Sequence, residues 1–205
     1  MAITRAVASS ITQGLPKSKS TLSGNLPIYA GSYESIATVT VGAGGASTVS
    51  FTSIAGTYKH LQLRFIGGNS QNTTGFLDLG IKINSDTTAG NYSTHQLMGD
   101  GATTYSGATA SGGTANGILT RYGSVWSNSA VDSKFTAGVF DFLDYANTNK
   151  YKTIRGLIGT DANGSGRVAL NSSLWLSTSA ITSITLAVPS NNLVQYSSFA
   201  LYGIN

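Results

Sequence analysis

Residues 76–84 read FLDLGIKIN, and the alternation within this stretch decides the fold of the chain. Leu77, Leu79 and Ile81 are spaced two residues apart, and Asp78 and Lys82 occupy the intervening register. Successive side chains of a β-strand point to opposite faces, so this spacing predicts a strand with one apolar and one solvated face.

The same period of two extends in both directions along the sequence. Residues 36–41 and 47–52 both alternate, and the glycine-rich residues 42–46 between them predict a hairpin. Residues 60–66 predict another strand. Further strands are expected near residues 92–98, 117–126, 134–143, 150–159, 167–176, 181–188 and 198–204. Without convincing helical periodicity after residue 33, the pattern predicts an all-β antiparallel sandwich.

Charged residues are scarce in this chain of 205 residues. They make up 10% of it, against roughly 25% in an average globular protein, so Ser, Thr, Asn and Gly must supply the polar surface. Residues 33–205 contain nine basic and eight acidic side chains, a net charge of +1. A nucleic-acid-binding domain would carry a basic stripe, so we predict no nucleic-acid partner.

The chain contains no cysteine, which excludes a disulfide framework and a thiolate metal site. No stretch approaches the roughly 18 apolar residues of a membrane helix, and residues 1–10 lack the continuous apolar segment of a secretion signal. We therefore expect a soluble protein, made in the cytoplasm, with no membrane partner.

The first 32 residues differ from the rest of the chain. They contain two of the three prolines and several glycines, which predicts an extended arm (residues 1–32) before a β-sandwich domain (residues 33–205). The arm holds three basic residues, no acid, and apolar side chains too scattered to form a core. We predict that it binds a partner; the alternative is a frayed terminus. The expected partner-binding residues are Arg5, Leu15, Lys17, Lys19, Leu22, Leu26 and Ile28.

Groups suited to catalysis are few. The histidines are His60 and His95, and no G-x-S-x-G motif is present. His95 and Asp100 would need a serine to complete a triad, and nothing singles one out. Asp141 and Asp144 are three residues apart, which places them on opposite faces of a strand rather than facing each other as in a glycosidase. We predict that the protein is not an enzyme and has no catalytic residue and no cofactor.

Two short stretches resemble binding loops. Residues 161–166, DANGSG, resemble the start of an EF-hand calcium loop, but Ser172 stands where the final acid is required. A tight Asn-Gly hairpin turn explains this stretch without a metal. Residues 42–47, GAGGAS, lack the last glycine of a dinucleotide fingerprint and precede a strand instead of a helix. We therefore predict no metal site and no nucleotide.

The large side chains divide between loop and core. Residues 99–117 are rich in Gly, Ala, Thr and Ser with Tyr105 as their one large residue, so they predict a long mobile loop. Most other aromatic residues fall within predicted strands and are interpreted as packing residues rather than a sugar-binding platform. Those expected in the core are Trp175, Phe135, Phe140, Phe142 and Phe199.

Four stretches carry a resemblance to a known family: SYESIATVTV (residues 32–41), FLDYANTNKYKT (142–153), LWLSTSAITSITL (174–186) and YSSFALYGI (196–204). They resemble small virion structural proteins of aquatic tailed bacteriophages. The resemblance covers roughly residues 32–205 and leaves the arm outside. It implies a jelly-roll-like β domain and a homotrimer. Members are capsid decoration (cement) proteins or tail-fibre components, and no functional residue carries over.

Together, these observations favour a structural virion protein. The leading hypothesis is a capsid decoration protein, assembled on the particle in the host cytoplasm and attached by its arm to the major capsid protein or another virion protein. The alternative is a tail-fibre or receptor-binding protein whose sandwich contacts a host surface glycan.

Overall fold

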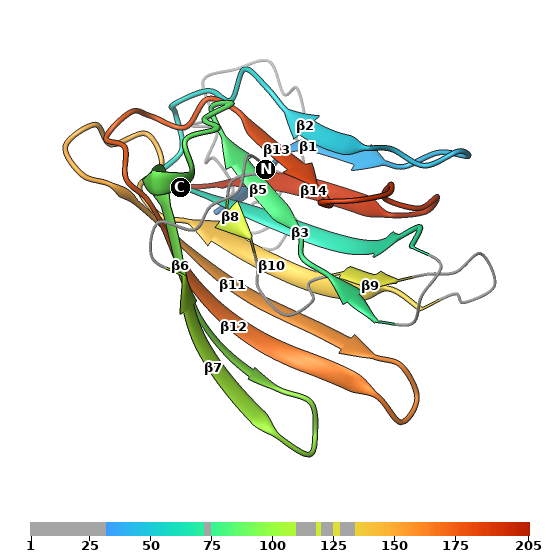
Figure 1. Cartoon of the computed structure of the whole chain (residues 1–205). Coiled ribbons are helices and arrows are strands. Elements are labelled where there is room, and N and C mark those ends of the chain that lie inside the picture. Colours follow the sequence, from blue (N-terminus) through green and yellow to red (C-terminus); the bar gives the residue numbers. More distant parts are fainter. Residues whose placement is uncertain (1–31, 72–74, 110–117, 120–124, 128–133) are drawn as a thin grey trace, which may run out of the picture. The chain divides into compact units, whose positions relative to one another are not determined.

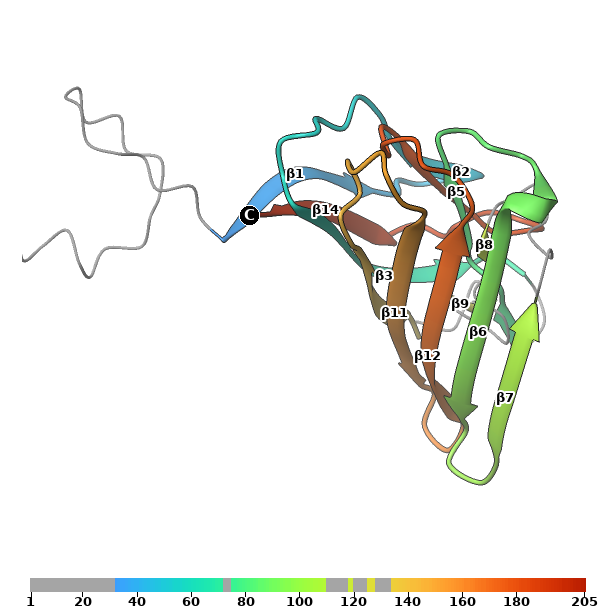
Figure 2. The same ribbon diagram turned by 90° about the vertical axis from the view of Figure 1, so that its left-hand side faces the viewer.

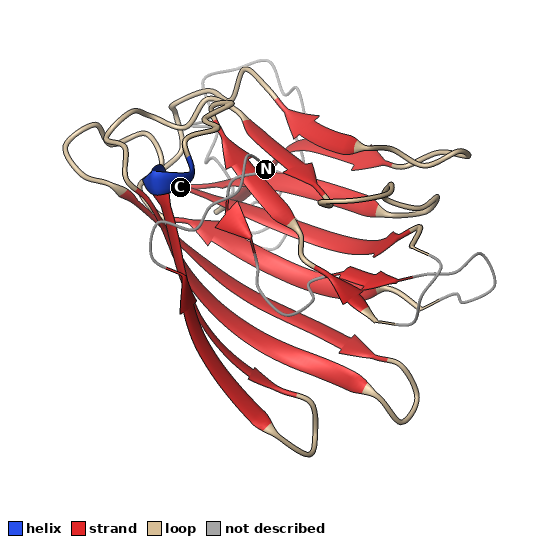
Figure 3. Ribbon diagram, viewed as in Figure 1, coloured by secondary structure: helices blue, strands red, loops and turns tan. Residues whose placement is uncertain are grey.

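The computed structural model describes residues 32–71, 75–109, 118–119, 125–127 and 134–205. Every described strand belongs to the unit Tyr33–Asn205. Within these ranges the regular secondary structure is β-strand except for one 3₁₀ turn, η1 (Ala89–Asn91) (Figure 3). The predicted all-β antiparallel sandwich is confirmed.

The large antiparallel sheet is the main layer of the domain (Figure 1). Its strands in spatial order are β1 (Tyr33–Thr40), β14 (Ser198–Ile204), β3 (His60–Asn69), β10 (Thr136–Phe142), β11 (Lys152–Asp161), β12 (Gly166–Trp175), β6 (Tyr92–Gly99) and β7 (Thr104–Thr109). Near the end of β3, the short strand β9 (Val125–Ser127) runs parallel to it and pairs in turn with β4 (Phe76–Leu77).

A smaller sheet covers part of one face of the large sheet. Its order is β2 (Thr48–Phe51), β13 (Ile184–Ala187), β5 (Gly80–Ile83) and β8 (Ile118–Leu119). The hairpins β6–β7 and β11–β12 extend beyond this small sheet, as Figures 1 and 2 both show. We call the covered side of the large sheet the inner face and the opposite side the outer face.

The core lies between the two sheets. Side chains from β2, β5 and β13 pack with the inward side chains of β3, β10, β11 and β14 in one cluster. At its centre the Phe65 ring stacks between Phe140 and Phe199, with ring centroids 5.9 Å and 5.8 Å apart. Trp175 is also buried, so the predicted core positions are confirmed except Phe135, which is only half-buried.

Two glycines make this aromatic stack possible. Gly138 lies opposite Phe65 on the neighbouring strand, and Gly156 lies opposite Phe140. A Cβ atom at Gly138 would be 2.4 Å from the Phe65 ring, and one at Gly156 would be 2.5 Å from the Phe140 ring. The rings therefore occupy the space that side chains would fill, which explains these two glycines inside strands.

The hairpin predicted over residues 36–52 is wrong. β1 pairs with β14 in the large sheet, whereas β2 pairs with β13 in the small sheet. The connection between them turns the chain from one sheet to the other through Gly44 and Gly45, both at positive φ. It is held there because Ala46 and Leu193 exchange backbone hydrogen bonds of 3.0 and 2.8 Å. Alternation predicts each strand correctly but not its partner.

Two other boundaries also differ from the sequence-based prediction. The loop expected over residues 99–117 contains the strand β7, which pairs with β6 from Thr94↔Thr109 to Gly99↔Thr104. Residues 110–117 lie outside the described part. The strand predicted over residues 76–84 is divided into β4 and β5, which belong to different pairings. The small side chains of β7 cannot form a hydrophobic core, but its backbone groups can still form hydrogen bonds with the neighbouring strand β6.

The Asn-Gly turn predicted at residues 161–166 is confirmed. Asp161 pairs with Gly166, and Asn163 and Gly164 between them have φ of 58° and 96°. Positive φ at both central residues is the geometry that the right-handed twist of a two-residue hairpin requires. Asp161 closes the turn by accepting a hydrogen bond from the Asn163 backbone at 2.9 Å.

The carboxylate of Asp86, beside the η1 turn, is the acceptor of three hydrogen bonds. It accepts hydrogen bonds from the Trp175 indole (2.8 Å), the Asn91 amide (2.8 Å) and the Thr88 backbone (2.9 Å). Burial raises the pKa of Asp86, but the hydrogen bonds from Trp175, Asn91 and Thr88 outweigh that effect and hold the pKa below its usual value. The folded state therefore stabilises the ionised carboxylate of Asp86 relative to its protonated form.

An Asp86→Asn variant tests this linkage. A carboxyl whose folded pKa is depressed stabilises the fold above its unfolded pKa of about 4, and this contribution is lost as the pH falls through the folded pKa. We expect the melting temperature of the variant to be lower than that of the wild type at pH 7, with the gap narrowing below pH 4. Melting curves followed by circular dichroism at pH 7 and pH 3 measure both gaps. A gap of equal size at the two values would contradict the assignment.

A buried lysine ties two loops together at one end of β11, the β10–β11 connection and the β12–β13 connection. Lys152 is 1% exposed, and its ammonium donates to the carbonyl oxygens of Asn147 (2.6 Å), Lys150 (2.9 Å) and Thr178 (3.0 Å). Burial, together with the charge of Lys150, lowers the pKa of Lys152. A lysine is seldom fully buried unless its charge is bonded in this way.

Candidate interaction surface

Strand β12 has the reverse of the usual burial pattern. Val168 and Leu170 point outward and are exposed, whereas Asn171 and Ser173 point inward and are buried. In a soluble sandwich the apolar side chains of a strand normally face the core and the polar ones face water. Between Val168 and Ser173 the larger apolar side chains are turned to the outside, although Trp175 at the end of the strand is buried.

Strand β6, the neighbour of β12, repeats this inversion. Leu97 is 55% exposed on the outer face, while Thr94 and Gln96 are buried on the inner face. Thr94 is satisfied there by a 2.9 Å hydrogen bond to Ser173. The Gln96 side-chain oxygen and the Asn171 side-chain amide have no hydrogen-bond partner within the described part of the chain. At these positions of β6 and β12, buried polar side chains face inward and exposed apolar side chains face outward.

The exposed apolar side chains lie in two adjoining rows across the outer face. In the first row Leu97 is opposite Leu170, Leu170 is opposite Leu157, and Leu157 is opposite Val139. In the second row the positions run through Gly99, Val168, Gly159, Ala137 and Ile66. We call these two rows the apolar face.

The apolar face is large enough to be a contact surface. Its five largest exposed side chains are 47–59% exposed, which corresponds to roughly 400 Å² of apolar area. Single exposed aliphatic residues are ordinary, and a contiguous patch of this size is comparable to the largest apolar patch of a typical monomer, which is often functional. The five side chains are Ile66, Leu97, Leu157, Val168 and Leu170.

A chain of polar side chains borders the apolar face. Arg155 donates to Asp141 at 3.0 Å, Gln62 donates to the other oxygen of Asp141 at 2.8 Å, and Arg64 donates to Gln62 at 2.7 Å. The Arg64 guanidinium also lies over the Tyr202 ring, 5.0 Å from its centroid. These long side chains are already held by one another, so less conformational entropy is lost when a partner covers them.

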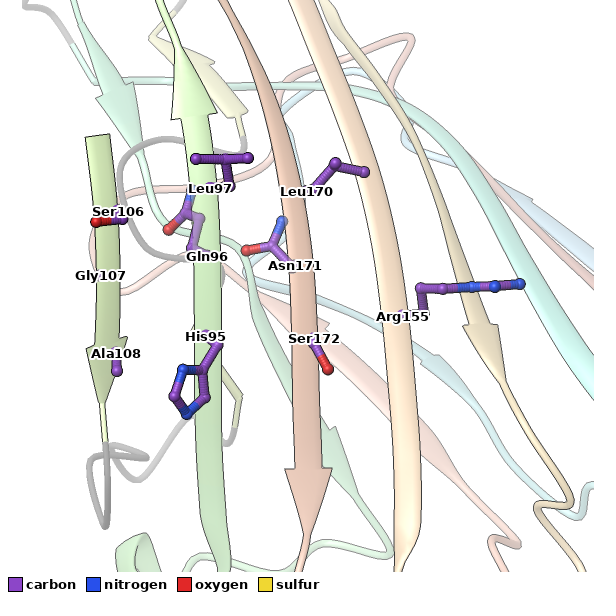
Figure 4. Close-up of a pocket in the computed structure, with 10 residues that line it drawn as sticks. All are labelled: His95, Gln96, Leu97, Ser106, Gly107, Ala108, Arg155, Leu170, Asn171 and Ser172. Carbon is purple, nitrogen blue, oxygen red and sulfur yellow. The ribbon is translucent and has the colours of Figure 1, made fainter. Parts of the chain in front are cut away.

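An open depression lies where the apolar face meets this polar border. It has a volume of about 650 Å³ and spans strands β7, β6, β12 and β11. Figure 4 shows His95 and Leu97 on β6, Leu170 and Ser172 on β12, and Arg155 on β11 around it. A broad hollow with both apolar and polar walls suits a protein surface better than a small enclosed ligand.

The two carboxylates considered for catalysis, Asp141 and Asp144, have different partners in the structure. Asp141 bonds to Gln62 and Arg155, while Asp144 forms an ion pair with Lys150 and lies 3.5 Å from His60. As predicted, the two carboxylates do not converge. Within the described ranges, no three His, Asp or Glu side chains are grouped closely enough to hold a metal ion.

The seven arm residues predicted to bind a partner, Arg5, Leu15, Lys17, Lys19, Leu22, Leu26 and Ile28, lie outside the described residues. The residues of the apolar face were missed in the sequence-based prediction. Alternation indicates a strand but does not say which of its faces is buried. β12 offered no local signal, because Val168 and Leu170 occupy the face that alternation would assign to the core.

No protein-family model, curated protein or solved structure matches this chain. No helix among the described residues is long and apolar enough to cross a membrane.

Proposed function

We propose that this protein is a structural component of a bacteriophage particle, most simply a capsid decoration protein. The observation that carries the proposal is the apolar face, an exposed patch of roughly 400 Å² of apolar area on the large sheet. Such a surface binds other proteins rather than transforming a substrate. The resemblance of residues 32–205 to phage virion proteins supplies the biological setting.

In this proposal the arm attaches the protein to the major capsid protein or another virion protein. Its three basic residues provide salt-sensitive contacts to an acidic rim, and its four isolated apolar side chains provide anchors of about 1–2 kcal/mol each when buried. Ordering a segment of this length costs conformational entropy, so several anchors must bind together. The sandwich then faces outward from the particle.

Deletion of residues 1–31 tests this attachment. We expect the truncated protein to keep the circular dichroism spectrum of the full chain and to lose binding to particles that lack the protein, measured by co-sedimentation. A full-length variant with Leu15→Ala, Leu22→Ala and Leu26→Ala keeps the length of the arm and removes three of its apolar side chains. We expect this variant to bind at least tenfold more weakly than the wild type. Binding of the wild type should also weaken as salt rises.

Equal co-sedimentation of the truncated and full-length proteins would show that the arm is not the attachment. Electron microscopy of decorated particles supplies the second criterion. We expect density for this protein over the capsid shell. Density confined to the tail would contradict the decoration role and support a tail-fibre role.

A further inference from the structure

We propose that the apolar face binds a second copy of this chain, through a two-fold axis that runs parallel to the strands between β11 and β12. The inference rests on the proposed function, because an arm that holds the particle leaves the apolar face of an outward sandwich uncovered. A second copy carries an identical apolar face, so two copies can cover each other's apolar face without a different protein.

The size of the outer face is sufficient for a stable pair. An axis between β11 and β12 brings six strands, from β3 to β7, over those of the second copy, and at about 4.8 Å spacing they give an overlap about 29 Å wide. A standard interface buries roughly 800 Å² on each partner, with an apolar centre and a polar rim. The apolar face supplies the centre, and the bordering polar side chains supply the rim.

The register of the strands makes this face complementary to itself. Rotation about the proposed axis places β11 of one copy over β12 of the other, and β10 over β6. Leu157 then lies opposite Leu170 of the second copy, and Val139 lies opposite its Leu97, because each pair shares one row. Val168, the most exposed of these side chains, lies opposite Gly159 of the second copy. Because glycine has no side chain, there is space there for the valine.

Charges follow the same symmetry. The next row contains His95, Ser172, Arg155 and Asp141 in adjacent strands. The rotation places the acidic Asp141 of one copy opposite His95 of the other, and Arg155 opposite the neutral Ser172. No like charges meet in this row, so the pairing carries no repulsive contact there.

Two sheets packed face to face lie about 10 Å apart, with strand directions within about 30° of each other. Positions close to the axis therefore stay together, whereas distant positions separate. Leu170 is half a strand spacing from the axis, about 2.4 Å, and Thr38 on β1 is about 22 Å from it, in the same row. These two positions give a test site and a matched control on one face.

Cross-linking of full-length single-cysteine variants tests the geometry. The chain has no cysteine of its own, so a bis-maleimide with a short spacer can join only the introduced residue to its copy. With Leu170→Cys we expect most of the protein to run at about 42 kDa, twice 21.1 kDa, on a denaturing gel. With Thr38→Cys we expect less than a tenth of that yield.

Light scattering of the full-length chain gives the second measurement. The wild type should have the mass of a dimer at tens of micromolar, Leu170→Asp that of a monomer, and Thr38→Asp that of a dimer. Both positions are exposed, so the variants should keep the wild-type circular dichroism spectrum. A wild-type monomer, the trimer expected from the resemblance, or a dimer that Leu170→Asp leaves intact would overturn the two-fold pairing. Particle binding is not read in either experiment, so failure of the pairing is distinguishable from failure of the arm's attachment.

Discussion

Replacing Lys152 with methionine is expected to lower the free energy of unfolding by about 3 kcal/mol, although methionine fills a similar volume. The lysine ammonium is the donor to the carbonyl oxygens of Asn147, Lys150 and Thr178. A hydrogen bond to a charged group contributes about 1.5–3 kcal/mol, and part of this loss is recovered where a freed carbonyl reaches water. Urea unfolding at pH 7 measures the change.

Lys150→Met is the matched control for this variant. Lys150 is two residues away and forms an ion pair with Asp144, but its side chain is 53% exposed. Exposed ion pairs contribute about 0–1 kcal/mol, so the control should lose less than 1 kcal/mol. Similar losses in the two variants would show that the buried lysine does not hold the two loops together.

Gly156→Val is expected to destabilise the domain by about 3 kcal/mol and to disturb the aromatic stack. Its Cβ would be 2.5 Å from the Phe140 ring, which is buried and stacked on Phe65 and so has no free space to move into. Overpacking of this kind forces side chains away from their preferred rotamers. Thermal unfolding measures the loss.

The clash itself is isolated by a double-mutant cycle. Phe140→Leu removes the ring, so adding Gly156→Val to that variant should cost at least 1 kcal/mol less than adding it to the wild type. Gly42→Val serves as a control, because a Cβ there meets nothing within 4 Å. Strict additivity of the two core substitutions would mean that Gly156 is required for another reason.

The sequence predicts strands well where apolar and polar residues alternate. The predictions near residues 134–143, 150–159, 167–176 and 198–204 correspond to β10, β11, β12 and β14. The Asn163–Gly164 turn was also predictable, because two consecutive positive φ angles strongly select these two residue types.

The same pattern did not predict which strands pair with each other or which face of a strand is buried. β1 and β2 are neighbours in sequence, yet β1 pairs with β14, which lies more than 150 residues later. In β12, Leu170 and Asn171 are adjacent, and which of them faces the core depends on what the rest of the chain places beside the strand. Local alternation carries no information about either, because both are decided by contacts distant in sequence.

The position of β14 has a consequence for how this domain is made. The last strand in sequence does not lie at an edge but between β1 and β3, and it pairs with both. On a ribosome, β1 emerges early and has no partner until residues 198–204 have been synthesised, so its backbone groups stay open throughout translation. Sheet closure is then a late event dominated by non-local pairing, which makes folding slow and leaves the growing chain dependent on protection from aggregation. The domain can therefore present its complete large sheet to a partner only after residues 198–204 have been synthesised.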